Sequence, residues 1–518
     1  MRRSAVGDDR NGHVRHERER TLLYQVVEAE LPAFLARHRD RPVPHFAAEE
    51  LRAFLRCGVL AHGFLRLRCD DCKLERLVAF SCKRRGFCPS CGGRRMADTA
   101  AHLVDRVWPH VPVRQWVLTL PYPLRYRCAY DPKLASEVLR AFLRALFSEL
   151  RRRIRREDGI RADQCGAVTF LQRFGSAMNL NLHFHTLAID GAFVYEADAA
   201  GSKSRPEFIA LNKPSPDEVA RVLAGTARRI TRLLERRLAT DEEDDLARNE
   251  PLLARLAQAS IHTRIATGPE TGERWQRLGD RVEPDATDAM SGQDDALVAR
   301  HHEMSLHAGV AVPANDRNRL ERLCRYVARP PLAHDRLQAL PDGRLALRLK
   351  TRWRDGTTHI LMERRDLIDR LVPLIPQPRA HQVRYHGILA PAASLRSRVV
   401  PAEPNVAEDL ARSQDESLAG DRVDVNPAPP RRRRLLWAQL LQRVFAIDAL
   451  RCPRCTNSLR LIAAIEDEAV ARRILDSIGL PARAPSDLLL PEPSPHHTEI
   501  DAAHDPEFEF DQSSPYED

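Results

Sequence analysis

The chain has 518 residues, 43% of them hydrophobic, and a formal net charge of +9, so two to four domains with their own cores are expected. It has no apolar run of roughly 18 residues and no apolar signal region at its start, which excludes transmembrane helices and favours a cytoplasmic location. Residues 491–518 carry nine acids and no Lys or Arg, so residues 1–490 have a formal charge of +18. Such a charge suits a polyanionic partner, although a basic protein without one is the alternative.

The N-terminal region predicts a charged extension followed by helices. Residues 1–18 are rich in charge and are expected to be disordered. Residues 19–38 place apolar side chains at helical spacing, and residues 47–60 show a similar pattern, so both segments should be amphipathic helices. With the cysteines that follow, they define an expected N-terminal zinc-binding domain over residues 19–100.

Two Cys-x2-Cys pairs separated by fifteen residues form the strongest local motif. This spacing is typical of zinc ribbons and treble clefs, in which two tight turns present four thiolates to one ion. We therefore expect one closed, structural Zn²⁺ site made by Cys69, Cys72, Cys88 and Cys91. Cys57 and Cys82 are left over as buried thiols or substitute ligands. Basic residues around the site form either a nucleic-acid surface or a solvated charged face: Arg84, Arg85, Arg94 and Arg95.

Residues 110–400 are expected to form one α+β domain with an antiparallel sheet and helices on one face. Residues 116–121 predict a buried strand, and residues 131–156 predict a helix with Pro at its first position. Residues 240–300 are expected to be an insertion or loop. Further elements follow from apolar spacing and turn signals: a strand over 166–175, a helix over 215–238, a strand over 305–313 and a hairpin over 343–363.

The segment after residue 175 alternates strictly between polar and apolar side chains, which predicts a half-buried strand. This strand directly follows the one over 166–175, so the two are expected to form a hairpin-like pair. His183 and His185 fall on the same face of this strand, with Asn179 and Asn181. Two neutral imidazoles one pleat apart can bind one divalent metal ion, whereas a helix would point them to nearly opposite sides. An isolated His-x-His is more often two polar residues facing solvent, so its interpretation depends on the rest of the chain.

Residues 316–329 predict a helix that is capped by Asn315 and stopped by Pro330. Tyr326 lies on this helix among four arginines, where its phenol could attack a phosphate; a tyrosine at the edge of the core is the alternative.

After residue 400 the sequence predicts a linker, a small helical unit and an acidic disordered tail, over residues 401–434, 435–485 and 486–518. The helical unit contains Cys452 and Cys455, which supply half of a zinc site, and the sequence gives no convincing second half.

Three ordered motifs resemble transposases of the insertion-sequence ninety-one type. They are Phe80-Ser-Cys-Lys with Phe87-Cys-Pro-Ser-Cys91 and Arg94-Arg-Met96, then Gln172-Arg-Phe-Gly175 with Asn181-x-His183-Phe-His185 and Asp190-Gly191, then Leu323-Cys-Arg-Tyr-Val-Ala-Arg329. The resemblance covers roughly residues 20–400 and the Cys452–Cys455 unit. It implies an HUH single-strand DNA nuclease fold and transposition by a rolling-circle-like route. Two-tyrosine members have a second tyrosine four residues after the first, where this chain has Pro330, so it is similar to the single-tyrosine branch.

The resemblance also implies partners and roles. The DNA partners would be single-stranded transposon ends and the target, at the bacterial nucleoid and without a membrane. Tyr326 would form a 5′-phosphotyrosine, His183 and His185 would bind Mg²⁺ or Mn²⁺, and Gln172 is the expected third ligand. Arginines of the tyrosine helix would contact DNA: Arg322, Arg325 and Arg329. Tyr385, between Arg384 and His386, is a rival nucleophile.

Two other functions fit parts of the sequence. A plasmid relaxase or replication initiator would use the same chemistry but would carry a helicase or primase domain, for which the sequence gives no sign. A zinc-dependent DNA-binding protein without catalysis would not need Tyr326 or His183.

Overall fold

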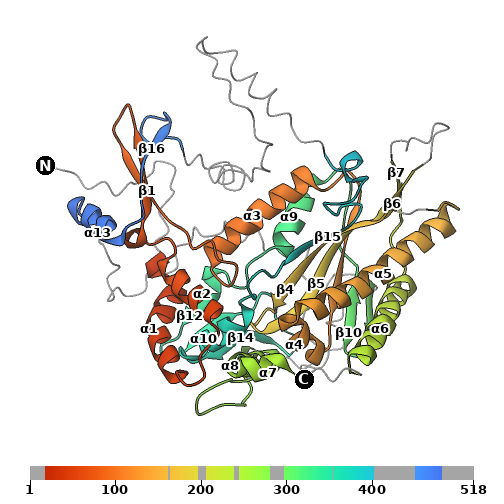
Figure 1. Cartoon of the computed structure of the whole chain (residues 1–518), viewed down its shortest axis with the longest axis horizontal. Coiled ribbons are helices and arrows are strands. Elements are labelled where there is room, and N and C mark those ends of the chain that lie inside the picture. The colour runs from red at the N-terminus through yellow and green to blue at the C-terminus, as the bar shows by residue number, and fades with distance from the viewer. Residues whose placement is uncertain are drawn as a thin grey trace, which may run out of the picture.

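The computed structural model describes residues 18–161, 164–195, 206–238, 244–279, 297–353, 355–401 and 450–480. Within these ranges the strands form sheets of seven, four, three and two strands, and their pairings are antiparallel, so the α+β class is confirmed (Figure 1). The described helices include none that is long and apolar enough to cross a membrane. The expected disordered start, the linker and the acidic tail lie almost entirely outside the described residues.

The seven-stranded sheet positions the candidate site. Its strand order is β15-β4-β5-β3-β10-β9, with β11 paired to β3. The expected pairing of the two strands around residue 175 is confirmed, because β4 and β5 are antiparallel neighbours with Gln172 opposite His183. The strands are β3 (Val113–Thr119), β4 (Gly166–Phe174), β5 (Leu180–Ile189), β9 (Val298–His301), β10 (Met304–His307), β11 (Ala311–Val312) and β15 (Val383–Gly387).

Helices cover both faces of this sheet, so the expectation of helices on one face is wrong. One face carries Trp116, Leu118 and Phe184, which share a core with α5 and α6. The opposite face carries Phe170 and Leu187, which share a core with α3 and α9. Figure 1 shows the two helix layers on either side of the sheet. The helices are α3 (Pro89–Arg106), α4 (Tyr122–Tyr130), α5 (Pro132–Glu157), α6 (Pro216–Leu238) and α9 (Arg317–Val327).

The strand β5 is buried along its whole length and is not half-buried as its alternating pattern predicted. Its polar face does not meet solvent, because α9 covers it. Alternation therefore assigned the residues to the correct two faces but did not identify the environment of the polar face. A buried row of histidine and asparagine needs internal partners or a ligand.

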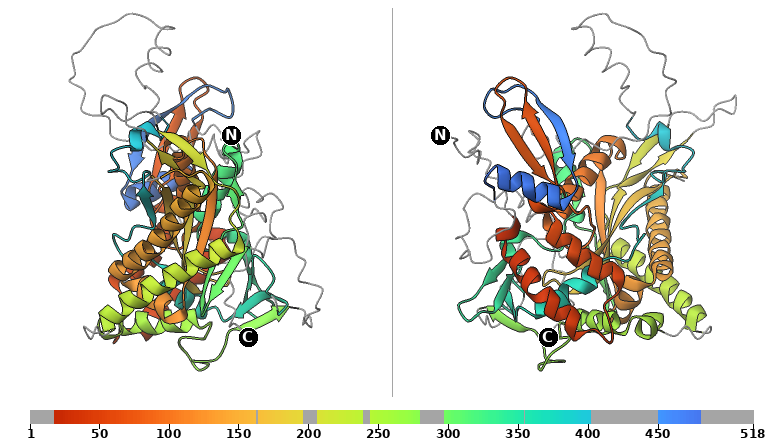
Figure 2. Two further views of the ribbon diagram at one scale, coloured as in Figure 1. Left: turned by 90° about the vertical axis from the view of Figure 1, so that its right-hand side faces the viewer. Right: turned by 60° about the vertical axis from the view of Figure 1, so that its left-hand side comes forward.

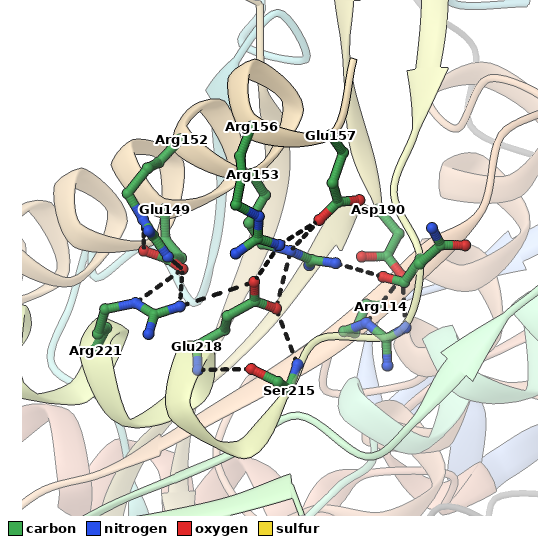
Figure 3. Close-up of polar contacts among 11 residues, drawn as sticks. Arg114, Glu149, Arg152, Arg153, Arg156, Glu157, Asp190, Ser215, Glu218 and Arg221 are labelled. Atoms are coloured by element: carbon green, nitrogen blue, oxygen red, sulfur yellow. Dashed lines mark hydrogen bonds and ion pairs between the residues drawn. The ribbon is translucent and has the colours of Figure 1, made fainter. Parts of the chain in front are cut away.

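A buried ion-pair network joins α5 to the start of α6 (Figure 3). The Glu218 carboxylate lies 3.0 Å from Arg153 Nε and 2.8 Å from Arg156 Nη2, and both Glu218 and Arg153 are buried. Ser215 and Glu218 also form a capping box, since each accepts a hydrogen bond from the other's backbone N–H, at 3.3 and 2.9 Å. Burial alone would raise the pKa of Glu218, but the Ser215 N–H and the two arginines together lower it below its ordinary value.

Replacing Glu218 with Gln should lower the free energy of unfolding by about 3 kcal/mol at pH 7, because Arg153 is left buried without its counter-charge. The carboxylate contributes this stability above its unfolded pKa of about 4.3, and the contribution is lost as pH falls through the lower folded value. Urea unfolding at pH 7 and at pH 3 should show the difference from wild type shrinking at the acidic pH. The exposed Glu235→Gln on α6 is the control, and equal midpoints for both variants would contradict the prediction.

The four-stranded sheet, of order β12-β13-β14-β8, shares one core with the N-terminal helices. Phe34 and Leu51 of α1 and α2 belong to the same buried cluster as Leu253 of α8 and Ile368 of α10. The two predicted N-terminal helices and the predicted hairpin over residues 343–363 are confirmed. These elements are α1 (Leu22–Arg37), α2 (His45–Arg56), α8 (Pro251–Ile261), α10 (Asp366–Leu371), β8 (Gln276–Gly279), β12 (Leu337–Ala339), β13 (Leu345–Arg348) and β14 (Thr357–Met362).

The region 240–300 is not simply a loop in its described part. It contains α7 (Asp245–Asn249), α8 and β8, and α8 is largely buried. Pro251 occupies the first turn of α8, and Leu252, Leu253 and Leu256 have helical spacing, so the local sequence supports this helix. A separate two-stranded ribbon directly follows β5 in the chain and consists of β6 (Gly191–Val194) and β7 (Glu207–Ala210).

The three-stranded sheet joins the two ends of the described chain. Its order is β16-β1-β2, from β16 (Leu459–Ile465), β1 (Phe64–Cys69) and β2 (Glu75–Ala79), and α13 (Glu468–Ser477) follows β16. Figure 2 shows β16 beside the β1–β2 hairpin. The expectation of a purely helical C-terminal unit is therefore wrong for residues 450–480. A sequence window cannot detect a strand whose partner is almost 400 residues away.

Candidate functional site

The strand β5 brings two buried histidines together. His183 Nε2 and His185 Nε2 lie 3.0 Å apart, and both side chains are at most 1% exposed. Burial lowers the pKa of His183 to about 3 and also lowers the pKa of His185 well below its ordinary value. The nearby cation of Arg329 acts in the same direction on both. Both imidazoles are consequently neutral at neutral pH, which is the state that binds metal ions.

Hydrogen bonds at the outer nitrogens orient the two rings. His183 Nδ1 donates to the Asn181 carbonyl at 2.8 Å, which leaves the lone pair of His183 on Nε2. His185 Nδ1 lies 3.4 Å from Nε2 of Gln115, on β3, while Gln115 Oε1 is buried without a partner. Turning this amide by 180° would let Oε1 accept the His185 Nδ1 proton. Both Nε2 lone pairs would then be available to one ion. A histidine that binds a metal usually donates a hydrogen bond from its other ring nitrogen, and this bond fixes the tautomer.

Gln172 supplies an oxygen on the same face of the sheet. It lies opposite His183 in β4, and its Nε2 donates to the Val327 carbonyl at 2.8 Å. Its Oε1 is buried without a partner, as is Asn181 Oδ1. A buried oxygen without a partner costs about 1–3 kcal/mol, which favours a ligand for it. Two neutral imidazoles and an amide oxygen form a donor set that can bind one divalent cation.

The helix α9 places Tyr326 against the histidines. The Tyr326 and His185 rings meet edge to face, with centroids 5.9 Å apart and an interplanar angle of 83°. The Arg329 guanidinium carbon lies 4.1 Å from the centroid of the Tyr326 ring. The N-cap of α9 is Asp316, whose Oδ1 accepts from the Arg319 N–H at 2.8 Å, and not Asn315 as predicted. The site thus combines two strands of the sheet with the last turn of α9.

The arginines expected to contact DNA have different surroundings. On α9, Arg322 is exposed and Arg325 pairs with Glu321 at 2.6 Å, whereas Arg329 lies two residues after the helix and stacks on Tyr326. Near the cysteines, Arg84, Arg85 and Arg94 are exposed and Arg95 is half-buried. Arg85 and Arg95 also donate to the carbonyls of Ala380 and Lys83, at 2.9 and 3.0 Å. These contacts do not test DNA binding, so the role of these arginines in DNA binding stays a prediction.

The rival Tyr385 lies away from the histidine pair. It is on β15, opposite Val168, whereas Gln172 and the histidines lie farther along the sheet. Two residues near the site were not singled out from the sequence, namely Gln115 and the buried Arg125, whose charge lowers the pKa of His183. Gln115 could have been noticed as a polar residue on the predicted strand region before Trp116. Arg125 carries no comparable signal.

The structure divides the four cysteines of the expected zinc site between two clusters. Cys88 and Cys91 lie with Cys57 and Cys82, whereas Cys69 and Cys72 lie with Cys452 and Cys455. The ligand atoms of each cluster are all within 4.8 Å of one another. The expected Cys69, Cys72, Cys88 and Cys91 site is therefore wrong. The reason is that β1 and β2 form a hairpin, with Cys69 and Cys72 at its tip and Cys57 and Cys82 flanking its open end.

The first cluster lies at the N-terminus of α3, which begins directly after Cys88. Arg18 Nη1 lies 2.8 Å from Cys57 Sγ and 3.2 Å from Cys88 Sγ, and the Cys82 N–H donates to Cys57 Sγ at 3.1 Å. These donors offset the negative charge that four thiolates would place around a Zn²⁺ ion. The donor set is that of a closed structural zinc site.

Replacing Cys88 with Ser should remove one zinc ion and loosen the start of α3, because binding and local folding are linked in small zinc units. Native mass spectrometry would count the ions, and hydrogen exchange would report protection of α3. The same change should weaken DNA binding measured by fluorescence anisotropy. Ser90→Ala, in the same Cys-x2-Cys turn, is the matched control; unchanged zinc content in Cys88→Ser would refute the assignment.

Two family models match the chain. The family described as "Transposase zinc-binding domain" matches residues 26–120, which include the first cysteine cluster. The family described as "Putative transposase" matches residues 166–397, which include Gln172, His183, His185 and Tyr326. No curated protein and no solved structure matches. The two domains support a structural zinc ion, DNA as the partner, and a DNA-cleaving or strand-transfer activity.

The two matches occur in one chain, in the order zinc-binding domain and then transposase domain, and together they include the first cysteine cluster, the histidine pair and Tyr326. Together the two matches support an IS91-family transposase.

Proposed function

We propose that this transposase nicks and rejoins single-stranded DNA at transposon ends through a phosphotyrosine at Tyr326. The proposal rests on one observation: Tyr326 meets the buried pair of His183 and His185, 5.9 Å from the His185 ring centroid. Residues that are distant in the sequence bring a phenol, two neutral imidazoles and arginines into one buried site. These groups are suited to phosphoryl transfer. The proposed divalent metal ligands are His183, His185 and Gln172.

In the proposed reaction the Tyr326 phenol loses its proton and its oxygen attacks the scissile phosphorus. A tyrosyl P–O bond forms, the bond from phosphorus to the O3′ atom breaks, and the 3′-hydroxyl leaves with a proton. The 5′-phosphotyrosine conserves the phosphodiester energy, so a 3′-hydroxyl can attack it and rejoin DNA without ATP. A bound Mg²⁺ or Mn²⁺ ion would supply a Lewis acid for the phosphate.

The charge around Tyr326 supports this role. Arg329 lies over the face of the Tyr326 ring, so its positive charge is placed beside the position where the phosphate would react. Arg125 and Arg329 also lower the pKa of His183, which indicates a positive potential at the site. A positive, buried environment stabilises the charge that develops on a phosphate during transfer.

Access to the site requires a local movement. Tyr326, His183 and His185 are each at most 2% exposed. The last turn of α9 is held to β4 by the hydrogen bond from Gln172 to the Val327 carbonyl. A scissile phosphate can therefore reach the phenol only when the covering elements shift, and DNA binding is the natural source of that displacement.

The decisive experiment incubates the protein with labelled single strands from the ends of its element and Mg²⁺. A denaturing gel should show a cut strand and a covalent protein–DNA adduct. DNA binding without either product would favour the zinc-dependent DNA-binding protein without catalysis.

Single-stranded ends should be cleaved at least about tenfold faster than the same sequences in a fully paired duplex. A buried phenol can receive one extruded backbone more readily than a stiff duplex, and pairing must first be broken in the duplex. Gel-based initial rates at matched salt would test this. Equal rates on both substrates would remove the single-strand preference from the proposal.

A further inference from the structure

We infer that the second cysteine cluster is a separate zinc site that fastens the C-terminal segment 450–480 onto the N-terminal β1–β2 hairpin. The cluster joins Cys69 and Cys72 at the hairpin tip to Cys452 and Cys455. The matched zinc-binding domain ends at residue 120, so it contains only half of these ligands. The protein would accordingly hold two structural zinc ions, one in each cluster.

The sulfur positions fit a metal ion and do not fit disulfides. Cys69 Sγ lies 3.4 Å from Cys455 Sγ, and Cys72 Sγ lies 3.4 Å from Cys452 Sγ. A disulfide needs about 2.05 Å between its sulfurs. Four sulfurs bound about 2.3 Å from a central Zn²⁺ in a tetrahedron stand roughly 3.8 Å apart. All four sulfurs lie within 4.8 Å of one another, close to that arrangement.

The two halves of the cluster are built as the same turn. In each, the residue four positions after the first cysteine donates to that cysteine's carbonyl, and the cysteine N–H donates to the carbonyl five positions on. The bonds are Lys73 to Cys69 (3.1 Å), Cys69 to Leu74 (2.9 Å), Thr456 to Cys452 (2.8 Å) and Cys452 to Asn457 (2.7 Å).

Both turns also hold a residue other than glycine in the left-handed region, Lys73 at φ 58° and Thr456 at φ 65°. A conformation of this kind costs of order 1–3 kcal/mol and persists when its surroundings impose it. The same costly turn occurs on two segments that are distant in sequence, and the two turns face each other with their thiols. This duplication indicates a site that is shaped for a shared ligand.

Beyond the cluster, the segment contacts the body through the β1–β16 strand pair and through Ala471 and Leu475 of α13, which are buried in the core of the N-terminal helices. The buried core at the cluster itself is small and consists of Leu67, Cys69, Cys452 and Leu459. On the outer side of β16, Leu461 and Ile462 are 55% and 44% exposed. Small units with a core of this size are commonly stabilised by a structural metal.

Polar contacts position the two halves without replacing a metal. Asn457 donates to Asp71 at 2.7 Å, and Arg460 lies 3.3 Å from Asp70, both in exposed positions. His62 and Glu468 form a partly exposed pair at 3.0 Å. Exposed pairs contribute roughly 0–1 kcal/mol each, which is small beside the conformational entropy lost when segment 450–480 is fixed on the hairpin. Four thiolates and their ion would supply a further, larger stabilisation.

Native mass spectrometry of the full chain should find two zinc ions per chain. Cys452→Ser with Cys455→Ser should retain one, in the Cys57 cluster, and Arg454→Ala in the same turn should retain two. A single zinc in the wild-type chain, or two in the double variant, would overturn the inference. The wild-type count needs no variant to fold, and it does not depend on whether Tyr326 forms an adduct.

A second measurement tests the fastening itself. A specific protease site introduced between residues 402 and 449 would be cut, and the C-terminal fragment followed by size-exclusion chromatography. The fragment should remain bound to the body in the wild-type background and dissociate in the Cys452→Ser, Cys455→Ser background. Retention of the fragment by the double variant would show that zinc does not hold it.

Discussion

Replacing Tyr326 with Phe should abolish DNA nicking and the covalent adduct together. Loss of a covalent nucleophile typically reduces the chemical step by a factor of about 10⁴ or more, and Tyr326 is the proposed nucleophile because its ring meets that of His185. Phe keeps the ring that packs on His185 and under Arg329, so the core around α9 should be preserved. Zinc content and DNA affinity should therefore remain close to wild type.

The matched control for this variant is Tyr385→Phe, which removes the rival phenol at β15. That variant should form the adduct at the wild-type rate. Mass spectrometry of the digested adduct should locate the DNA on the peptide that contains Tyr326. An adduct in Tyr326→Phe, or a modified peptide that contains Tyr385, would show that another residue is the nucleophile.

Local pattern was sufficient to predict the elements that carry the proposed catalytic residues. Period-two alternation put His183 and His185 on one face of a strand, and helical spacing put Tyr326 on a helix; the structure has both elements. The pairing of β4 with β5 also followed from their adjacency in the sequence, and it placed Gln172 opposite His183. These features depend on residues close together in the chain, whose preferences act directly on local conformation.

The errors came from contacts between distant segments. Spacing alone grouped Cys69 and Cys72 with Cys88 and Cys91, because nothing in a local window shows that a hairpin separates the pairs. The partners of Cys452 and Cys455 could not be identified from the sequence for the same reason, since Cys69 and Cys72 precede them by about 380 residues. Likewise, the second layer of helices on the central sheet includes α3 from the N-terminal part and α9 from much later in the chain.

The histidine pair gives the second large effect: His183→Ala and His185→Ala should each reduce cleavage by roughly 10³-fold or more while DNA affinity stays near wild type. Each variant removes one imidazole whose Nε2 lies 3.0 Å from the other, so the proposed ion loses a ligand and the phosphate loses its Lewis acid. DNA affinity should come mainly from dispersed arginines, which these substitutions leave in place.

The measurements for this prediction are single-turnover cleavage with Mg²⁺ and fluorescence anisotropy for binding, with the exposed His301→Ala on β9 as the control. The pH profile supplies an independent check on the histidine environment. Because burial lowers the pKa of His183 to about 3, and lowers that of His185 well below its ordinary value, neither ring is expected to become charged near pH 6.5. Cleavage should thus show no fall centred near pH 6.5, where an ordinary histidine becomes charged. Native-rate cleavage by either alanine variant would remove the histidines from the proposed metal site.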